Sequence, residues 1–271
     1  KHITILHTND THSQIEPFES DHHRYANKGG VARRAMMVEK IRNENPNTLL
    51  LDAGDIFQGT PYFNYFGGEI EFKLMSLLKY DAATLGNHDF DNSIEGFHKQ
   101  LPNAKFDFVC ANYDFKNTVL DTLVKPYKIF FKDGIKVGVF GLGIELLNLV
   151  SPELYKETNY LDPIGISQDI SRELKEDEAC DLIICLSHLG YNYRNSDKIS
   201  DLKLASITKN IDLIIGGHTH TFLPKPTLVK NLNDENMLVN QVGAYGVNLG
   251  RVDFYFDENN HKQTSEKTII L

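Results

Sequence analysis

Side chains that could bind metal ions gather in five short segments of this 271-residue chain. Carboxylate, carboxamide and imidazole groups are all ligands that divalent metal ions accept in proteins. The segments are residues 10–12, 54–55, 86–91, 187–188 and 216–220. Together they contain enough Asp, Asn and His to hold two divalent cations.

Each of the five segments follows a short apolar run, directly or within three residues. The runs are residues 3–6, 49–51, 82–85, 182–186 and 213–215. Such runs are typical of strands in a sheet that is covered on both faces. Ligands of such sheets bind in the crevice outside the carboxyl ends of the strands. We therefore expect the five loops to direct their polar side chains at one place.

Asp55 is the residue that we expect to bridge the two cations. A two-metal hydrolase needs cations about 3.5 to 4 Å apart that share a carboxylate. Gly54 permits the sharp backbone turn that brings the Asp55 carboxylate inward. Asp10 and His12 are two residues apart, as are His218 and His220. In an extended segment, residues at this spacing point to the same side.

Each of these residues also has an ordinary explanation. A lone Asp at a strand end is usually a helix cap or a turn residue, and a lone His is usually a surface residue. Asn87 after Gly86 would ordinarily be a turn residue. Seven residues of metal-binding type in five loops favour a metal site over a separate explanation for each.

The order of the five segments resembles the calcineurin-like metallophosphoesterases, and more narrowly the N-terminal catalytic domain of their 5′-nucleotidase and 2′,3′-cyclic-nucleotide phosphodiesterase branch. The resemblance runs from residues 6–12 to residues 243–251, almost the whole chain. It implies two divalent metal ions, Zn, Mn or similar, that share Asp55. The other ligands that it implies are Asp10, His12 and His220 for one ion and Asn87, His188 and His218 for the other.

His88 has a different implied role. It is adjacent to Asn87 and so cannot point at the same metal in regular geometry. In the family this histidine faces the substrate phosphoryl group and pairs with an acid three residues on, which is Asp91 here. Such a pair fixes the imidazole tautomer and raises its pKa. The alternative is that His88 only orients Asn87.

The resemblance implies a hydrolase of phosphoric esters, most closely a 5′-nucleotidase-like phosphomonoesterase acting on a nucleotide. A 2′,3′-cyclic-nucleotide phosphodiesterase with 3′-nucleotidase activity is one alternative, and a catalytically silent metal-binding scaffold is another. The scaffold is disfavoured because every implied ligand and the His–Asp pair are present. In the family, a C-terminal domain holds the nucleoside base. We expect that domain to be absent from this chain or to be a separate partner chain, and so expect weak nucleotide binding by this chain alone.

Composition narrows the class of protein further. A length of 271 residues fits one hydrophobic core, so we expect a single catalytic domain over residues 1–271. The formal net charge of −9 disfavours binding to nucleic acid or to anionic membranes. No apolar stretch approaches the roughly 18 residues of a membrane span. The resemblance implies a periplasmic or secreted location after removal of a targeting segment. Cys110, Cys180 and Cys185 are expected to be buried thiols.

The remaining pattern alternates strands with helices. We expect helices over residues 31–45 and 69–78, a short one after Asn92 capped by Asn92 and Glu95, one from Asp162, and one near 199–209. We expect a strand at 106–111, a hairpin over 127–140 and antiparallel strands at 227–229, 237–242 and 251–256. This pattern indicates an α/β fold, and the family resemblance implies a four-layer αββα sandwich of two mixed β-sheets.

Other polar and aromatic segments carry weaker signals. Residues 21–24, with His22 and His23, could be an extra metal site, but a solvated loop is favoured. The aromatic residues in 61–66 could line the mouth of the pocket or cap the core. His7 is expected to be buried.

Overall fold

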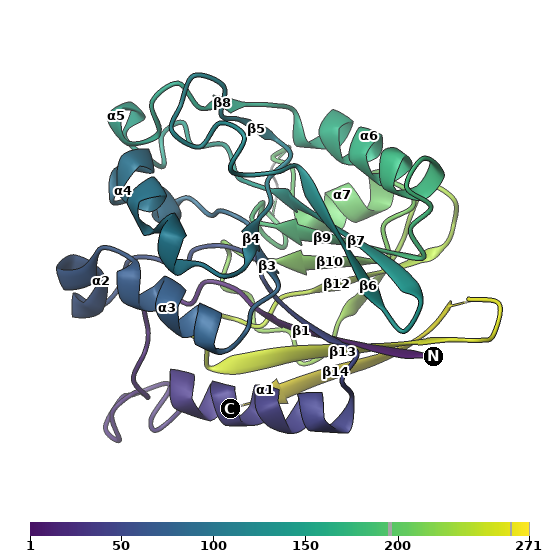
Figure 1. Cartoon of the computed structure of the whole chain (residues 1–271), viewed down its shortest axis with the longest axis horizontal. Helices are drawn as coiled ribbons and strands as arrows, with labels where there is room; N and C mark the ends of the chain where they lie inside the picture. The colour runs from purple at the N-terminus through teal and green to yellow at the C-terminus, as the bar shows by residue number, and fades with distance from the viewer. Residues whose placement is uncertain (195–196, 261, 271) are drawn as a thin grey trace.

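Two six-stranded sheets pack face to face between layers of helices in the computed structural model, which describes residues 1–194, 197–260 and 262–270 (Figure 1). The first sheet has the order β14 (Lys262–Ile270), β13 (Asn248–Phe256), β1 (His2–Thr8), β2 (Thr48–Asp52), β3 (Ala82–Ala83) and β4 (Asp107–Phe108). The second has the order β11 (Thr227–Lys230), β12 (Asn236–Asn240), β10 (Leu213–Gly216), β9 (Leu182–Ser187), β7 (Ile135–Leu142) and β6 (Tyr127–Lys132). A small third sheet pairs β5 (Tyr113–Asp114) with β8 (Asn159–Tyr160).

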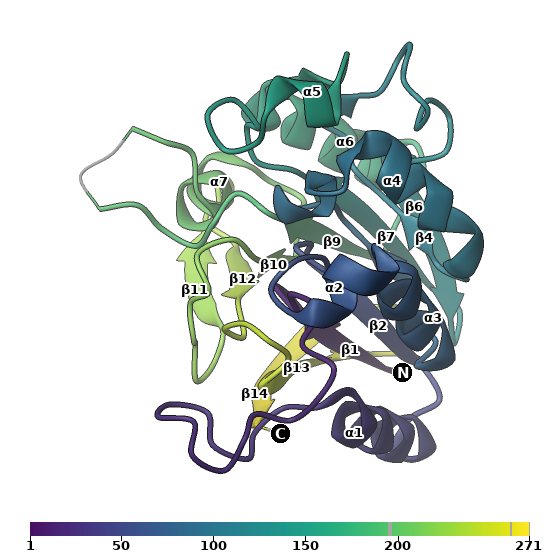
Figure 2. The ribbon, with the colours of Figure 1, turned by 90° about the vertical axis from the view of Figure 1, so that its left-hand side faces the viewer.

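Helices cover the outer face of each large sheet (Figures 1 and 2). On the first sheet lie α1 (Val31–Glu44), α3 (Glu69–Leu77) and α4 (Ser93–Gln100), with α2 (Pro61–Phe66) and α5 (Pro152–Tyr155) beside them. On the second lie α6 (Pro163–Glu176) and α7 (Asp201–Ile207). Two 3₁₀ helices, η1 (His88–Phe90) and η2 (Leu101–Asn103), flank α4.

The apolar strands are buried on both faces. In β2, Leu49 and Leu51 pack between the sheets, whereas Leu50 packs under the helices of the first sheet. In β9, Ile184 faces the other sheet and Ile183 faces α6 and α7. Successive strand side chains point to opposite faces, so a strand inside a four-layer sandwich is apolar on both faces over most of its length. The predicted α/β class and αββα arrangement are confirmed.

Most expected elements form, but several differ in extent or pairing. β3 and β4 are only two residues long, shorter than the expected runs 82–85 and 106–111. The tail is not purely antiparallel, because β12 pairs in parallel with β10 and antiparallel with β11. The strand β14, which extends the first sheet beside β13, was not expected from the sequence.

The two expected helix caps have different outcomes. The side chain of Asp162 accepts hydrogen bonds from the backbone N–H groups of Ile164 and Gly165, so this cap is confirmed. Asn92 precedes α4 but makes no side-chain cap bond. Its amide instead donates to Gly67 O, and Ser93 Oγ accepts from Gly96 N. The predicted Asn92 and Glu95 capping pair is therefore wrong.

The cysteine expectation is confirmed, since Cys110, Cys180 and Cys185 are free and buried. Among the described helices, none has the length and apolar character needed to cross a membrane.

Candidate metal centre

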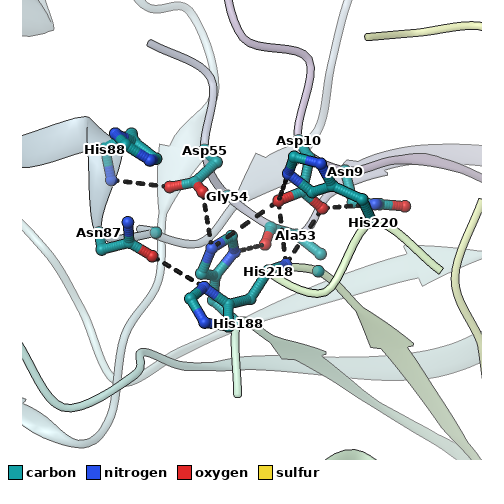
Figure 3. A network of polar contacts seen from close by, with 12 residues as sticks. Asn9, Asp10, Ala53, Gly54, Asp55, Asn87, His88, His188, His218 and His220 are labelled. Atoms are coloured by element: carbon teal, nitrogen blue, oxygen red, sulfur yellow. Dashed lines mark hydrogen bonds and ion pairs between the residues drawn. The ribbon is translucent and has the colours of Figure 1, made fainter. Parts of the chain in front are cut away.

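The five predicted segments meet at one edge of the sandwich, where parallel strands of both sheets end (Figure 3). β1, β2 and β3 deliver residues 10–12, 54–55 and 86–91 from the first sheet. β9 and β10 deliver residues 187–188 and 216–220 from the second. All seven predicted metal ligands come together there, in two groups that lie side by side.

The first group contains Asp10, His12 and His220, whose ligand atoms all lie within 4.8 Å of one another. The Nε2 atoms of His12 and His220 are 3.0 Å apart, and His220 Nε2 is 3.4 Å from Asp10 Oδ1. The other ring nitrogen of His12, Nδ1, lies 3.2 Å from the carbonyl oxygen of Phe57. If Nδ1 donates to that carbonyl, the neutral His12 ring carries its lone pair on Nε2, which faces into the group.

The second group contains Asp55, His188 and His218. His188 Nε2 lies 3.0 Å from Asp55 Oδ2, and His188 Nδ1 lies 2.7 Å from the carbonyl oxygen of Ala53. His218 Nδ1 lies 2.9 Å from Asn87 Oδ1, which brings the carboxamide of Asn87 to the same group.

Asp55 stands between the two groups. Its Oδ2 atom is 3.0 Å from His188 Nε2 in the second group and 3.9 Å from His12 Nε2 in the first. Its other oxygen accepts a hydrogen bond of 2.8 Å from the backbone N–H of His88. This carboxylate is buried, so water does not screen it from the surrounding imidazoles.

The backbone of these loops is not extended, contrary to our expectation. Asp10, His12, His218 and His220 all have positive φ, at 50°, 48°, 69° and 50°. These left-handed residues turn each loop tightly and send His218 and His220 to different groups. A non-glycine residue rarely adopts this conformation, and such strain concentrates at functional sites.

The turn expected at Gly54 is present, with a φ of 87°. A Cβ atom at this position would lie 2.6 Å from Gly86 N and 2.9 Å from His188 Nδ1. Contacts this close do not occur for real side chains. Gly54 is therefore required for the loops of Asp55, Asn87 and His188 to approach one another.

Asp89 has a role that sequence reasoning missed. It is buried, and its carboxylate accepts backbone hydrogen bonds from Gly86, Asp55, Ile56 and Phe57 at 2.8 to 3.2 Å. Burial raises the pKa of Asp89 to about 7, with the Asp55 charge acting in the same direction. One side chain thus joins the loop after β2 to the loop after β3. The sequence signal that could have indicated this is the place of Asp89 between two candidate site residues, His88 and Asp91.

Asn9 links the first loop to the loop between β12 and β13 in a similar way. Its amide donates to Asp10 Oδ2 and to the carbonyl of Gly243, each at 2.6 Å, and its oxygen accepts from Val242 N. His7, as expected, is buried, and burial lowers its pKa to about 3.

The electrostatics of the two groups fit bound cations. Burial lowers the pKa of His12 and of His218, so both rings are neutral, as a metal ligand must be. Burial opposes a charged His188, but the Asp55 carboxylate outweighs it and raises the pKa of His188. His188 Nε2 is a buried atom with no hydrogen bond of normal geometry. A cation held by Asp55 and His188 would satisfy both groups at once.

His88 and Asp91 pair as predicted, beside the two groups, and both side chains are partly exposed. His88 Nδ1 is 2.7 Å from Asp91 Oδ2, and the His88 side chain is half-buried. The hydrogen bond to Asp91 is the main cause of a raised pKa for His88. The ring of His88 also lies beside that of His12, with centroids 5.3 Å apart.

The weaker sequence signals have mixed outcomes. His22 and His23 belong to neither group of metal-binding side chains in the described part of the chain. Of the aromatic residues in 61–66, Tyr65 and Phe66 are exposed, whereas Phe63 packs on the core cluster beneath the first sheet. The core-capping alternative is therefore supported for Phe63.

Comparison with known proteins gives one consistent result. The sequence profile of the calcineurin-like phosphoesterase family matches residues 3–222. The chain is 34% identical over 304 aligned residues to the trifunctional nucleotide phosphoesterase protein YfkN of Bacillus subtilis. This alignment covers 99% of this chain and 19% of that protein. It is 33% identical over 299 residues to the 5′-nucleotidase of Homo sapiens, which covers 99% of this chain and 49% of that protein.

A solved structure agrees with the sequence comparisons. The 5′-nucleotidase precursor from Thermus thermophilus superposes with a TM-score of 0.90 at 33% identity, covering 100% of this chain and 55% of that one. The chain thus spans about half the length of the 5′-nucleotidases that it matches. The family resemblance drawn from the five segments is confirmed.

Proposed function

The chain belongs to the calcineurin-like phosphoesterase family, and we propose that it forms the catalytic domain of a 5′-nucleotidase-like phosphomonoesterase with two divalent metal ions. The observation that carries this proposal is the position of Asp55. Its carboxylate lies between imidazole and carboxylate ligands of both groups, most of them buried, and is within reach of both.

The proposed ligands are those of the two groups. Asp10, His12 and His220 hold one cation, Asn87, His188 and His218 hold the other, and Asp55 is shared. When bound, such cations supply Lewis acidity, lower the pKa of a coordinated water and offset the charge that builds up on phosphorus. Zn, Mn and similar ions all suit this mixture of ligands.

The side chains around the groups orient these ligands. Ala53 O and Phe57 O accept from the Nδ1 atoms of His188 and His12, which fixes both rings with Nε2 directed inward. Asp89 keeps the loop of Asp55 against the loop of Asn87. Because these supports are buried backbone and carboxylate groups, the ligand geometry is set before substrate arrives.

His88 is proposed as the proton donor to the leaving alcohol. Its Nδ1 is engaged by Asp91, so its Nε2 is the nitrogen directed away from that pair and available for substrate. The hydrogen bond to Asp91 keeps the ring protonated to higher pH. A half-exposed imidazolium beside a buried metal site can reach an oxygen of a bound phosphate ester without being a metal ligand.

Nucleoside 5′-monophosphates are the proposed substrates. This is supported by the relatives, several of which are named 5′-nucleotidase and match 99% of this chain. The selectivity of those whole proteins does not transfer directly, because this chain spans only about half of their length. We also propose a periplasmic or secreted location, supported by relatives named snake venom 5′-nucleotidase. Fractionation of the source cells tests it.

Phosphate release from a substrate panel tests the proposed activity. The panel contains adenosine 5′-monophosphate, adenosine 3′-monophosphate, 2′,3′-cyclic AMP and p-nitrophenyl phosphate, each with Mn²⁺, Zn²⁺ or chelator. We expect release from the 5′-monophosphate and from p-nitrophenyl phosphate, abolished by chelator. Preference for the cyclic or 3′ substrate would assign the chain to the other activity of its branch. If no ester is hydrolysed with either metal, the remaining alternative is a metal-binding scaffold without catalytic activity.

A further inference from the structure

Gln241 directly follows β12 and lies against the loop that carries His218 and His220. β12 pairs in parallel with β10, so the two strands end at the same edge of the second sheet. The side chain of Gln241 is fully buried. Burying a carboxamide is costly unless it is hydrogen-bonded, so the partners of this side chain indicate what it does.

Both ends of the Gln241 carboxamide bind the histidine loop. Nε2 donates to the carbonyl of Gly217, one residue before the first histidine, at 2.5 Å. Oε1 accepts from the hydroxyl of Thr219 at 3.0 Å, and it also accepts from the backbone N–H of Thr221, one residue after the second histidine. One buried side chain therefore contacts the loop before, between and after the two histidines.

The conformation of this loop divides the two histidines between the metal-binding groups (Figure 3). His218 and His220 have φ of 69° and 50°, in the left-handed region that non-glycine residues rarely adopt. In an extended segment, two residues at this spacing would point to the same side. Contacts from outside the loop must therefore hold the turn that delivers one histidine to each group.

Other side chains also hold the same turn. The carboxylate of Asp10 accepts from the backbone N–H of His218 at 2.9 Å, and Thr219 Oγ1 accepts from the backbone N–H of Tyr191 at 3.0 Å. Asp10 is itself a proposed metal ligand, and Thr219 belongs to the turn. Gln241 is neither, so it can hold the turn whether or not a metal ion is bound.

We propose that Gln241 is a positioning residue for the metal centre. By holding residues 217–221 in their turn, it directs His218 to one cation and His220 to the other. This role rests on the proposed two-metal function. It predicts that the affinity for both ions depends on Gln241, since loss of a residue that orients metal ligands usually lowers metal affinity about 10- to 100-fold.

Calorimetric titration of Mn²⁺ into the chelator-treated chain tests this role without a catalytic step. Gln241→Met keeps the length of the side chain but removes its three hydrogen bonds. It should raise the dissociation constants of both ions about 10- to 100-fold.

Asn45→Leu is the matched control. Asn45 is also a buried carboxamide with three hydrogen bonds, to His2 O, Thr4 Oγ1 and the backbone N–H of Asn47. These partners lie at the amino end of β1, away from the metal-binding loops. Asn45→Leu should lower the melting temperature but leave both dissociation constants within about twofold, as expected for distant, independent sites.

A milder pair of variants guards against a folding defect in Gln241→Met. Thr219→Val keeps the shape of the side chain but lacks the hydroxyl that donates to Gln241, and should raise both dissociation constants about 2- to 10-fold. Thr219→Ser restores the hydroxyl and should restore the affinity. Because Gln241→Met and Thr219→Val remove the same contact, the double variant should lose less than the product of the single effects.

The outcomes distinguish this role from the proposed function. Unchanged dissociation constants in Gln241→Met, a rise for one ion alone, or an equal rise in Asn45→Leu would overturn the role of Gln241 while the hydrolase survives. The predicted rises in a chain that hydrolyses no ester would support the role and overturn the hydrolase. If the unmodified chain binds no Mn²⁺, both are overturned.

Discussion

The Nε2 atoms of His12 and His220 lie 3.0 Å apart, although 208 positions separate them in the sequence. If His12 donates from Nδ1 to Phe57 O, its Nε2 carries a lone pair directed at the other ring. Two imidazoles approach this closely when they share a proton or a cation. With Asp10 Oδ1 3.4 Å from His220 Nε2, a bound cation would satisfy all three groups.

Metal binding is therefore expected to stabilise the fold as well as to permit catalysis. Removing the metal with a chelator should lower the melting temperature by about 5 to 10 °C, because a ligand at a hundred times its Kd contributes about 2.7 kcal/mol. Differential scanning calorimetry measures this shift. Asp169→Ala, which removes an exposed carboxylate on α6, should show the same shift as the unmodified chain. An unchanged melting temperature would indicate that the two groups bind no metal.

His88→Ala is expected to retain its metal and lose turnover. Its ring is not needed by either metal-binding group, whereas loss of a general acid lowers kcat about 10²- to 10⁴-fold. Elemental analysis and steady-state kinetics on the same sample check both parts. Should His88→Ala lose metal in proportion to activity, the residue would be a structural support that only orients Asn87.

The pH profile reports the contribution of Asp91. Since the hydrogen bond to Asp91 raises the pKa of His88, the protonated ring persists to higher pH, and kcat should fall only as the pH rises through that raised value. Asp91→Asn removes the charge and should move this fall to lower pH, with a smaller loss of kcat than His88→Ala. If the fall of kcat at high pH occurs at the same pH in Asp91→Asn as in the unmodified chain, Asp91 does not act through His88.

Asp89→Ala is expected to destabilise the chain even without metal. Four backbone N–H groups lose their acceptor inside the protein, and each buried unsatisfied group costs about 1 to 3 kcal/mol. We expect a loss of at least about 3 kcal/mol in the free energy of unfolding, measured by urea titration in chelator. Asp169→Ala should change it by less than about 0.5 kcal/mol. A small effect of Asp89→Ala would mean that water replaces the carboxylate.

Sequence reasoning was strongest where the physical rule is local. Strands buried on both faces are apolar over most of their length, so the runs before Asp10, Asp55, His188 and His218 could be recognised, and so could the loops that follow them. Asp162 and Pro163 likewise begin α6 as their types require. Family resemblance then supplied the division of the ligands between two groups, which spacing alone does not determine.

The features that were missed depend on contacts between distant segments. The left-handed conformation of Asp10 and His220 is imposed by tertiary packing. Neither position is a glycine, so the sequence does not indicate this conformation. The role of Asp89 was missed because its four backbone partners belong to two different loops. The cavity beside His12 and His220 combines Phe18 and residues 22–25 with Phe222 and Tyr245, which are far apart in the chain. Periodicity and motif spacing do not contain that information.

The most direct test of the dinuclear centre is a metal titration in which bound metal and phosphate release are measured on the same samples. Starting from the chelator-treated chain, hydrolysis of adenosine 5′-monophosphate should rise with added Mn²⁺ and saturate when two ions are bound per chain. Asp55→Ala, which removes the shared carboxylate, should bind neither ion tightly and remain inactive. Full activity with one bound ion, or an Asp55→Ala variant that retains both ions, would contradict the two-metal account.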